Sequence, residues 1–316
     1  MDGSSAPLPR GAAGLDAGLP QRTLKSAIGC VGVGLHSGQR VRISLHPAPA
    51  ESGIVFRRTD LGVDIPAIFD AVVDTRLCTV IGAGDVPEAR IGTVEHLLAA
   101  LRGCGIDNAR VDLDGPEVPI LDGSAASFVF LLDCAGSAAQ DAPRREIEVL
   151  RPVRVEDGDG FVELQPRERG AGFDMALSID FDAAAIGHQA LALELTAGSF
   201  RQELARARTF TLASEIAGLQ AAGLALGGSL ENAVVVDEER VLNPGGLRMP
   251  DEFVRHKMLD AVGDLALAGP LLRARLVAHR PGHTLNNRVL RALFADPGAW
   301  RHVPATALPG WLSAAA

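Results

Sequence analysis

The chain has 316 residues, of which 47 % are hydrophobic, and a formal net charge of −9 at pH 7. This apolar content suits one large or two medium domains and is too high for a disordered chain. The acidic balance, with no run of Lys or Arg interleaved with aromatic residues, speaks against a nucleic-acid partner. A small-molecule partner is therefore expected.

The spacing of the cysteines and the composition of the N-terminal residues bear on the cellular compartment. Cys30, Cys78, Cys104 and Cys134 form no C-x-x-C pair, which speaks against a disulfide scaffold or a cysteine-built zinc site. Residues 1–20 lack the charged and apolar regions of a secretory signal, and we interpret them as a flexible leader. No window reaches the roughly 18 apolar residues of a membrane span. We expect a cytoplasmic protein without an integral membrane segment.

The first half of the chain combines strands with two helices. "RVRISLHP" and "NARVDLDG" alternate polar and apolar residues, which predicts strands. "GTVEHLLAALRGCGI" predicts a helix that is capped by Thr93 and ends at Gly103 or Gly105. "DGSAASFVFLLDCAG" predicts a second helix, capped by Asp122 or Ser124.

The second half repeats this plan after the polar interval "GSAAQDAPRRE", the candidate domain junction. "REIEVLRPVRVED", "GFVELQP", "GFDMALSIDF" and "RARLVAHRPG" predict strands, while residues 251–268 and "HTLNNRVLRALFAD" predict helices. Strands followed by two helices in each half predict a duplicated α+β fold with the site between the halves. We assign residues 21–142 to domain I, 143–298 to domain II and 299–316 to a C-terminal tail.

The helix over residues 251–268 carries a candidate metal site. His256 and Asp260 are four residues apart, so they project from the same helix face at a spacing that can bind zinc. Such a pair is more often a surface pair or a core histidine. His96 offers a third ligand if both helices face one cleft. It stands beside Glu95 in an otherwise apolar helix, where two ionisable groups are costly to bury unless paired or metal-bound.

Three ligands and an open fourth position are typical of a catalytic zinc, which lowers the pKa of its bound water to about 7. Glu95, next to a ligand, is placed to act as general base. His283 follows Gly282 before a helix and is the candidate general acid, and Asp264 could orient its imidazole.

Two further residues complete the hypothesis. Thr209 in "ARARTFTL" could donate a hydrogen bond to the developing oxyanion. Lys257 could bind an anionic substrate group, with a solvated helix lysine as the equal alternative. His279 lies in the predicted strand "RARLVAHR" and is interpreted as structural.

A set of ordered motifs extends this pattern: "QRTLKSAIGCVGVGLHSG", "TVEHLLAAL", "GPEVPILDGSA", "ARARTF", "GLALGGSLENAVVVDEERVLN", "DEFVRHKMLDAVGDLAL" and "GHTLNNRVLRAL". Together they closely resemble the UDP-3-O-acyl-N-acetylglucosamine deacetylase family, the zinc amidases of lipid A biosynthesis. The resemblance runs from about Gln21 to Phe294.

The resemblance implies two domains of the ribosomal protein S5 domain 2-like type, with zinc ligands on His96, His256 and Asp260. It implies the following further roles: base Glu95, acid His283 oriented by Asp264, oxyanion donor Thr209, substrate-binding Lys257, and Phe210 against the sugar nucleotide. One zinc ion per chain is expected, although ferrous iron would accept the same ligands. The family's members are usually cytosolic monomers, which is the expectation here.

The resemblance also implies an apolar passage for the substrate's acyl chain, formed by an insert near residues 211–241. Candidate wall residues are Leu212, Ile216, Leu224, Ala225, Leu226 and Leu230, with Leu35, His36 and Leu77 at the mouth. Ordinary core packing is the alternative for each apolar residue singly.

The implied reaction is hydrolysis of the N-acetyl group of UDP-3-O-(3-hydroxyacyl)-N-acetylglucosamine by zinc-bound water, which releases acetate. This is the committed step of lipid A biosynthesis. Two alternatives stay open: a zinc amidohydrolase for another N-acylated sugar, and a sugar-nucleotide-binding module without catalysis.

Overall fold

The computed structural model describes residues 19–167 and 170–305. Most of the predicted leader and of the predicted tail lies outside these ranges. At the two ends, Pro20 begins the first strand, and residues 300–304, assigned to the tail from the sequence, form the last strand, β20.

The first half of the chain forms three sheets, the largest of which has five strands in the order β2-β3-β9-β4-β5. Its strand β3 alternates as the sequence predicts, because Val41, Ile43 and Leu45 are buried while Arg40 and Arg42 are exposed. The strands are β1 (Pro20–Leu24), β2 (Ile28–Val33), β3 (Arg40–Pro47), β4 (Ile54–Arg58), β5 (Val63–Pro66), β6 (Val72–Asp74), β7 (Val80–Ala83), β8 (Val86–Ile91), β9 (Ala109–Leu113) and β10 (Ser137–Pro143).

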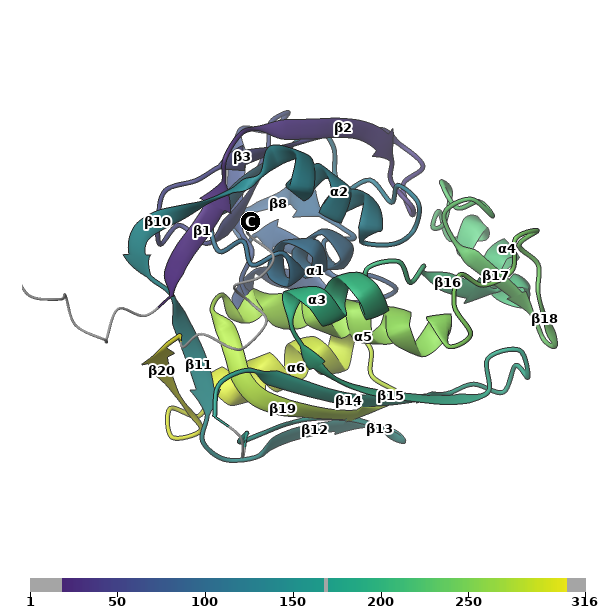
Figure 1. Ribbon diagram of the computed structural model, residues 1–316. Helices are drawn as coiled ribbons and strands as arrows, with labels where there is room; N and C mark the ends of the chain where they lie inside the picture. Colours follow the sequence, from purple (N-terminus) through teal and green to yellow (C-terminus); the bar gives the residue numbers. More distant parts are fainter. Residues whose placement is uncertain (1–18, 168–169, 306–316) are drawn as a thin grey trace, which may run out of the picture.

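The second half forms a seven-stranded sheet in which β19 pairs with β11 and β14 in parallel and with β13 antiparallel. Its strands are β11 (Arg145–Val149), β12 (Val153–Asp157), β13 (Gly160–Gln165), β14 (Phe173–Asp180), β15 (His188–Leu195), β19 (Leu271–His279) and β20 (Trp300–Pro304). A separate small sheet projects at one end of the molecule and carries helix α4 (Figure 1). Its strands are β16 (Phe210–Leu212), β17 (Val234–Asp237) and β18 (Arg240–Val241).

Helices fill the space between the two main sheets. In Figure 1, α1 lies against α5, with α6 beside α5, so the layers run sheet, helices, helices, sheet. The described helices are α1 (Glu95–Gly103), α2 (Ala126–Ala135), α3 (Ala197–Ser199), α4 (Ala213–Ala221), α5 (Glu252–Leu265) and α6 (His283–Phe294). Three short helical turns, Phe69–Ala71, Phe200–Leu204 and Ala266–Ala268, accompany them. The chain therefore has a mixed α/β architecture.

A glycine sets how closely the two central helices approach. A Cβ atom at Gly263 of α5 would lie 2.0 Å from the carbonyl oxygen of Glu95. Glycine in the middle of a helix costs about 1 kcal/mol relative to alanine. Here it allows the backbone of α5 to touch the start of α1, which brings His96 toward the polar face of α5.

Both predicted helix caps of the first half are wrong. The N-cap of α1 is Val94, because Thr93 has a positive φ of 57° and its hydroxyl donates to Glu117 Oε1 at 2.9 Å. A capping side chain needs extended backbone at its own position. The N-cap of α2 is Ala125, and Ser124 Oγ instead accepts from the N–H of Ala126 at 3.2 Å.

The polar interval predicted as a junction is largely a strand. Residues 137–143 form β10, which pairs with β1, and β11 begins at Arg145. Within residues 19–167 and 170–305, each pair of hydrogen-bonded strands lies on one side of Arg144. The chain thus passes from the sheets of the first half to those of the second at this residue.

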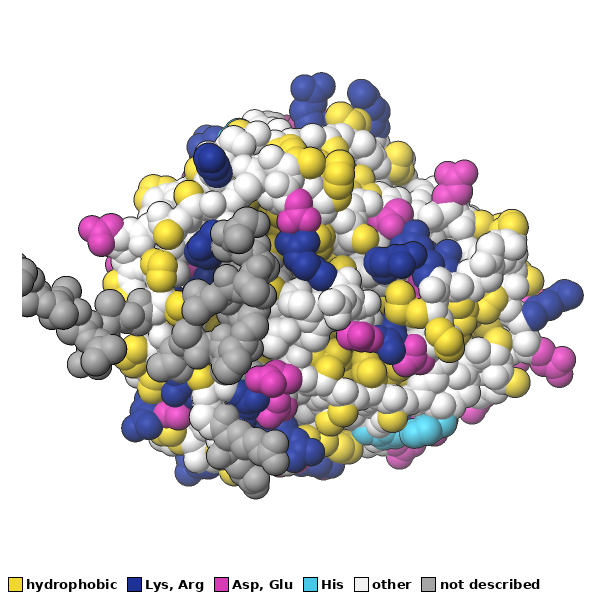
Figure 2. Space-filling model, in the orientation of Figure 1, with side chains coloured by type: hydrophobic (Ala, Val, Ile, Leu, Met, Phe, Trp, Pro, Cys, Tyr) yellow, Lys and Arg dark blue, Asp and Glu magenta, His cyan; other side chains and the backbone are white. Residues whose placement is uncertain are grey.

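The surface mixes charge types on the face drawn in Figure 2, where basic and acidic side chains are interspersed with apolar ones. Within the described ranges, none of the helices has both the length and the apolarity needed to cross a membrane.

Candidate metal centre and reaction site

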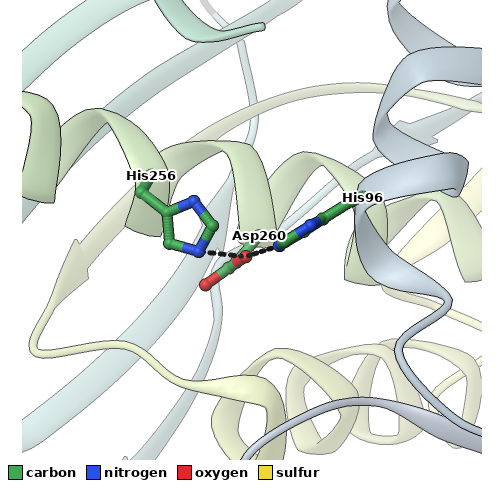
Figure 3. A group of neighbouring side chains, drawn as sticks. All are labelled: His96, His256 and Asp260. Atoms are coloured by element: carbon green, nitrogen blue, oxygen red, sulfur yellow. Dashed lines mark ion pairs between the residues drawn. The ribbon is translucent and has the colours of Figure 1, made fainter. Parts of the chain in front are cut away.

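Three side chains from α1 and α5 converge where the two helices touch (Figure 3). Asp260 Oδ1 lies 3.2 Å from His256 Nε2 and 3.5 Å from His96 Nε2. The ligand atoms of all three residues lie within 4.8 Å of one another. The predicted spacing on α5 and the predicted partner on α1 therefore form one cluster.

The cluster has the properties of a metal site. Asp260 Oδ1 is buried and has no hydrogen-bond partner, which is costly for a carboxylate oxygen unless a cation completes it. Burial, together with the charges of His96 and Lys257, lowers the pKa of His256 to about 3 against the opposing effect of Asp260. The imidazole is thus neutral, the form that binds metal.

The surroundings of the cluster orient its members. His256 Nδ1 is 3.2 Å from the carbonyl oxygen of Ala207, which directs Nε2 toward Asp260. Lys257 Nζ donates to Asp260 Oδ2 at 3.1 Å. Burial alone would raise the pKa of Asp260, but the adjacent imidazoles and the positive charge of Lys257 hold it well below its usual value. The carboxylate is therefore ionised and can bind a cation such as zinc.

Glu95 lies beside the cluster and is 3 % exposed. Its Oε2 accepts a hydrogen bond from the backbone N–H of Thr79 at 3.1 Å. Burial raises the pKa of Glu95, while the nearby charges of His283 and His96 oppose this shift. A raised carboxyl pKa is what a general base working near neutral pH requires.

His283 and Asp264 form the predicted pair. His283 Nδ1 lies 2.8 Å from Asp264 Oδ2. Burial alone would lower the pKa of His283, but the charge and the hydrogen bond of Asp264, with Glu95 and Asp260, raise it to about 9. The imidazole is then protonated at neutral pH and can act as an acid.

A polar cavity of about 300 Å³ joins these groups. Its lining includes the three candidate ligands, Glu95, His283 and the substrate candidates, which are Leu35, His36, Leu77, Thr209, Phe210 and Lys257. The ring of Phe210 packs against Phe253 and His256, with centroid distances of 4.9 and 6.1 Å. Phe210 is therefore fixed at the edge of the cluster.

A second, apolar cavity of about 370 Å³ lies under the small sheet and α4. It shares five lining residues with the polar cavity: Leu35, His36, Leu77, Thr209 and Phe210. Ile216, Ala225 and Leu230 line it as expected. The other three candidate wall residues differ: Leu212 lines a separate cavity that also contains Lys257, and Leu224 and Leu226 line neither.

Sequence reasoning missed several polar residues around the site. Asp264 also accepts from Thr79 Oγ1 at 2.5 Å and from Asn286 Nδ2 at 2.9 Å. Glu117 accepts from Thr93 Oγ1 and from the backbone N–H groups of residues 36 and 37, so it holds the loop at the cavity mouth. The missed residues, Thr79, Asn286 and Glu117, stand at no helical spacing from a candidate metal ligand, so no such spacing marks them.

Glu252, in the first turn of α5, is fully buried in an ion pair. Its Oε1 accepts from Arg208 Nε at 2.8 Å, and its Oε2 accepts from the Arg208 guanidinium at 3.0 Å and from the backbone N–H of Arg248 at 2.7 Å. The segment that carries Thr209 is thereby attached to the first turn of α5.

A His-His-Asp cluster beside a buried carboxylate is the donor set of a metal-dependent hydrolase. Comparison with known proteins defines the family. The sequence profile of UDP-3-O-acyl N-acetylglycosamine deacetylase matches residues 21–295. The chain belongs to this family of enzymes, hydrolases that act on an amide.

The sequences of known relatives align with this chain over nearly its whole length. UDP-3-O-acyl-N-acetylglucosamine deacetylase of Acidithiobacillus ferrooxidans is 53 % identical over 287 residues, which cover 90 % of this chain and 92 % of the relative. Its namesakes from Anaeromyxobacter sp. and Idiomarina loihiensis are 51 % and 50 % identical, each over 90 % of this chain and 92 % and 93 % of the relative. The predicted family is therefore confirmed.

Proposed function

We propose that this protein hydrolyses the N-acetyl group of UDP-3-O-(3-hydroxyacyl)-N-acetylglucosamine, releasing acetate and a free amino sugar, as the committed step of lipid A biosynthesis. The observation that carries this proposal is the polar cavity that holds His96, His256, Asp260, Glu95 and His283 and shares five lining residues with an apolar cavity. A polar reaction centre beside an apolar cavity matches a sugar substrate with an acyl chain.

The metal would be held by His96, His256 and Asp260. When bound, zinc lowers the pKa of a water ligand to about 7 and polarises an amide carbonyl. Ferrous iron accepts the same two nitrogens and one oxygen. Asp260 Oδ1, which accepts no hydrogen bond, and the neutral imidazole of His256 support this assignment.

The remaining residues move protons and hold the substrate. Glu95 takes a proton from the attacking water, and the Thr209 hydroxyl donates to the oxygen of the former carbonyl as it gains charge. His283, oriented by Asp264, donates its proton to the departing nitrogen as the C–N bond breaks. The charge of Lys257 and the ring of Phe210 suit the sugar nucleotide, with the Lys257 ammonium 5.6 Å from the ring centroid.

The acyl chain would enter the apolar cavity. Its lining by Ile216, Leu219, Ala225, Leu230 and Leu242 supports this placement. Excluding water from an acyl chain contributes about 0.8 kcal/mol per buried methylene. The cavity thus gives a reason for the enzyme to prefer the acylated sugar over the free one.

We further propose two domains, 21–142 and 143–298, each of the ribosomal protein S5 domain 2-like type, with an insert near 211–241. The passage of the chain between separate sheets at Arg144 supports the boundary. The four cysteines are free, which suits a reducing cytoplasm. We expect a monomer.

The test is acetate release from UDP-3-O-(3-hydroxyacyl)-N-acetylglucosamine by the purified protein, before and after chelation and zinc restoration. We expect activity that disappears with the chelator and returns with zinc. A substrate without the 3-O-acyl chain should be turned over poorly. Equal turnover of both substrates would favour an amidohydrolase for another N-acylated sugar, and binding without turnover by metallated protein would favour a binding module.

A further inference from the structure

Thr79 contacts two carboxylates with different roles in the proposed reaction: the base Glu95, and Asp264, which orients the acid His283. It lies directly before β7 and is 1 % exposed. Its backbone N–H donates to Glu95 Oε2 at 3.1 Å, and its hydroxyl donates to Asp264 Oδ1 at 2.5 Å. Its carbonyl oxygen accepts from the N–H of Val94, the residue before α1, at 3.4 Å. One residue of the first half thus touches the start of α1 and the last turn of α5.

The hydrogen bond from the Thr79 hydroxyl differs from that of another buried threonine in the charge of its acceptor. Thr23, the comparable buried threonine, gives its proton to the carbonyl oxygen of Asn108 at 2.8 Å. Thr79 gives its proton to a carboxylate that is 1 % exposed, and such charge-assisted bonds are roughly twice as strong as neutral ones.

Asp264 receives donors on both oxygens. Oδ2 accepts from His283 at 2.8 Å and from Asn286 at 2.9 Å, whereas Oδ1 accepts from Thr79. Without the Thr79 hydroxyl, a carboxylate oxygen would lose its donor inside the protein. The carboxylate could then rotate, and the direction of the His283 imidazole would no longer be fixed.

We propose that Thr79 is a positioning residue that holds the base Glu95 and the acid pair of Asp264 and His283 in one arrangement. Its backbone fixes the carboxylate of Glu95, and its hydroxyl fixes Asp264 and, through it, His283. The proposal rests on the proposed function for the roles of these groups. It does not place Thr79 in contact with the substrate.

The first test uses the near-isosteric Thr79→Val, which removes the hydroxyl and keeps the backbone N–H. We expect kcat to fall about ten- to a hundredfold, as for other residues that orient catalytic groups, with KM and metal content unchanged. Thr79→Ser keeps the hydroxyl and should restore kcat. Thr23→Val is the matched control and should leave kcat unchanged, although it also removes the hydroxyl of a buried threonine.

A double-mutant cycle tests the route of the effect. If the hydroxyl acts through Asp264, Thr79→Val should have little further effect on kcat in an Asp264→Ala background. Additive losses would overturn the proposal, because they would mean that Thr79 acts independently of Asp264.

A spectroscopic readout separates this proposal from the proposed function. The NMR signal of the proton on His283 Nδ1, assigned by its loss in His283→Gln, reports the bond to Asp264 whether or not acetate is released. We expect Thr79→Val to shift this signal and Thr79→Ser to leave it in place. If the wild-type protein released no acetate and Thr79→Val still shifted the signal, the proposed function would be wrong and the positioning role would stand. An unchanged signal in Thr79→Val would overturn the positioning role even in an active enzyme.

Discussion

The two neighbouring cavities are built in opposite ways. Five titratable side chains that line the polar cavity are almost entirely buried, with exposures of 8 % or less: Glu95, His96, His256, Asp260 and His283. Beyond the residues that both cavities share, the apolar cavity has walls that are partly open to solvent, since Leu230 is 44 % exposed and Leu242 is 38 % exposed.

This difference predicts how each region responds to change. Buried polar groups depend on specific partners, and removing one partner leaves another unsatisfied, so single substitutions should have large effects. Apolar contact has no direction and depends mainly on volume and area, so the apolar cavity should tolerate most changes and respond chiefly to blocked space.

The largest effect is expected at the base. Glu95→Gln keeps the size and the hydrogen bond from Thr79 but cannot accept a proton, so kcat should fall by about 10² to 10⁴. Metal analysis of the same sample is the control, and the metal content should equal that of the wild type. Loss of the metal would mean that Glu95 is a ligand.

A second prediction concerns the segment that borders both cavities. Glu252→Gln leaves the guanidinium of Arg208 without its buried charge partner, which should lower the free energy of unfolding by about 3–5 kcal/mol. Urea unfolding followed by circular dichroism measures this. Glu203→Gln is the matched control, because its ion pair with Arg255 is partly exposed and should contribute at most about 1 kcal/mol. Equal losses in both variants would contradict the structural role of the buried pair.

The pH dependence gives a third, smaller effect. The acid must be protonated, so activity should be lost as the pH rises through about 9, the pKa of His283. Asp264→Asn removes the charge that raises this pKa, and the alkaline limb of the kcat/KM profile should move to lower pH. The loss at neutral pH should be about ten- to a hundredfold. An alkaline limb that stays in place would show that another group supplies the proton.

The same contrast explains what the sequence could predict. The spacing of His256, Asp260 and Asp264 follows from helical geometry, so one face of α5 was predictable from its residues alone. That His96 meets this face depends on contact between helices far apart in the chain. Its place beside Glu95 in an otherwise apolar helix marked His96 as a candidate ligand, and the ordered family motifs implied the same role. Helices and strands with regularly spaced apolar residues were predictable for a similar reason, because that spacing lies within one segment of the sequence.

Contacts that no regular residue spacing indicates could not be predicted from the sequence. Thr79 is one threonine among many in the sequence, and only the tertiary packing brings its hydroxyl to Asp264. The cap expected at Thr93 failed because Glu117, distant in sequence, binds that hydroxyl. Leu212 was expected to line the passage, but its side chain lines the separate cavity that also contains Lys257.

The smallest effect is expected in the apolar cavity, and it should depend on the substrate. Ile216→Trp adds bulk to the wall formed by α4, so kcat/KM for a long acyl chain should fall about tenfold, within the range by which a hydrophobic pocket discriminates by size. A short-chain substrate should be affected much less, because it does not reach the blocked space. Ala217→Trp places the same side chain on the next, exposed residue of α4 and should leave both substrates unaffected. A uniform loss with both chain lengths would mean that Ile216 supports the reaction centre, and the tolerance inferred for the apolar cavity would then be wrong.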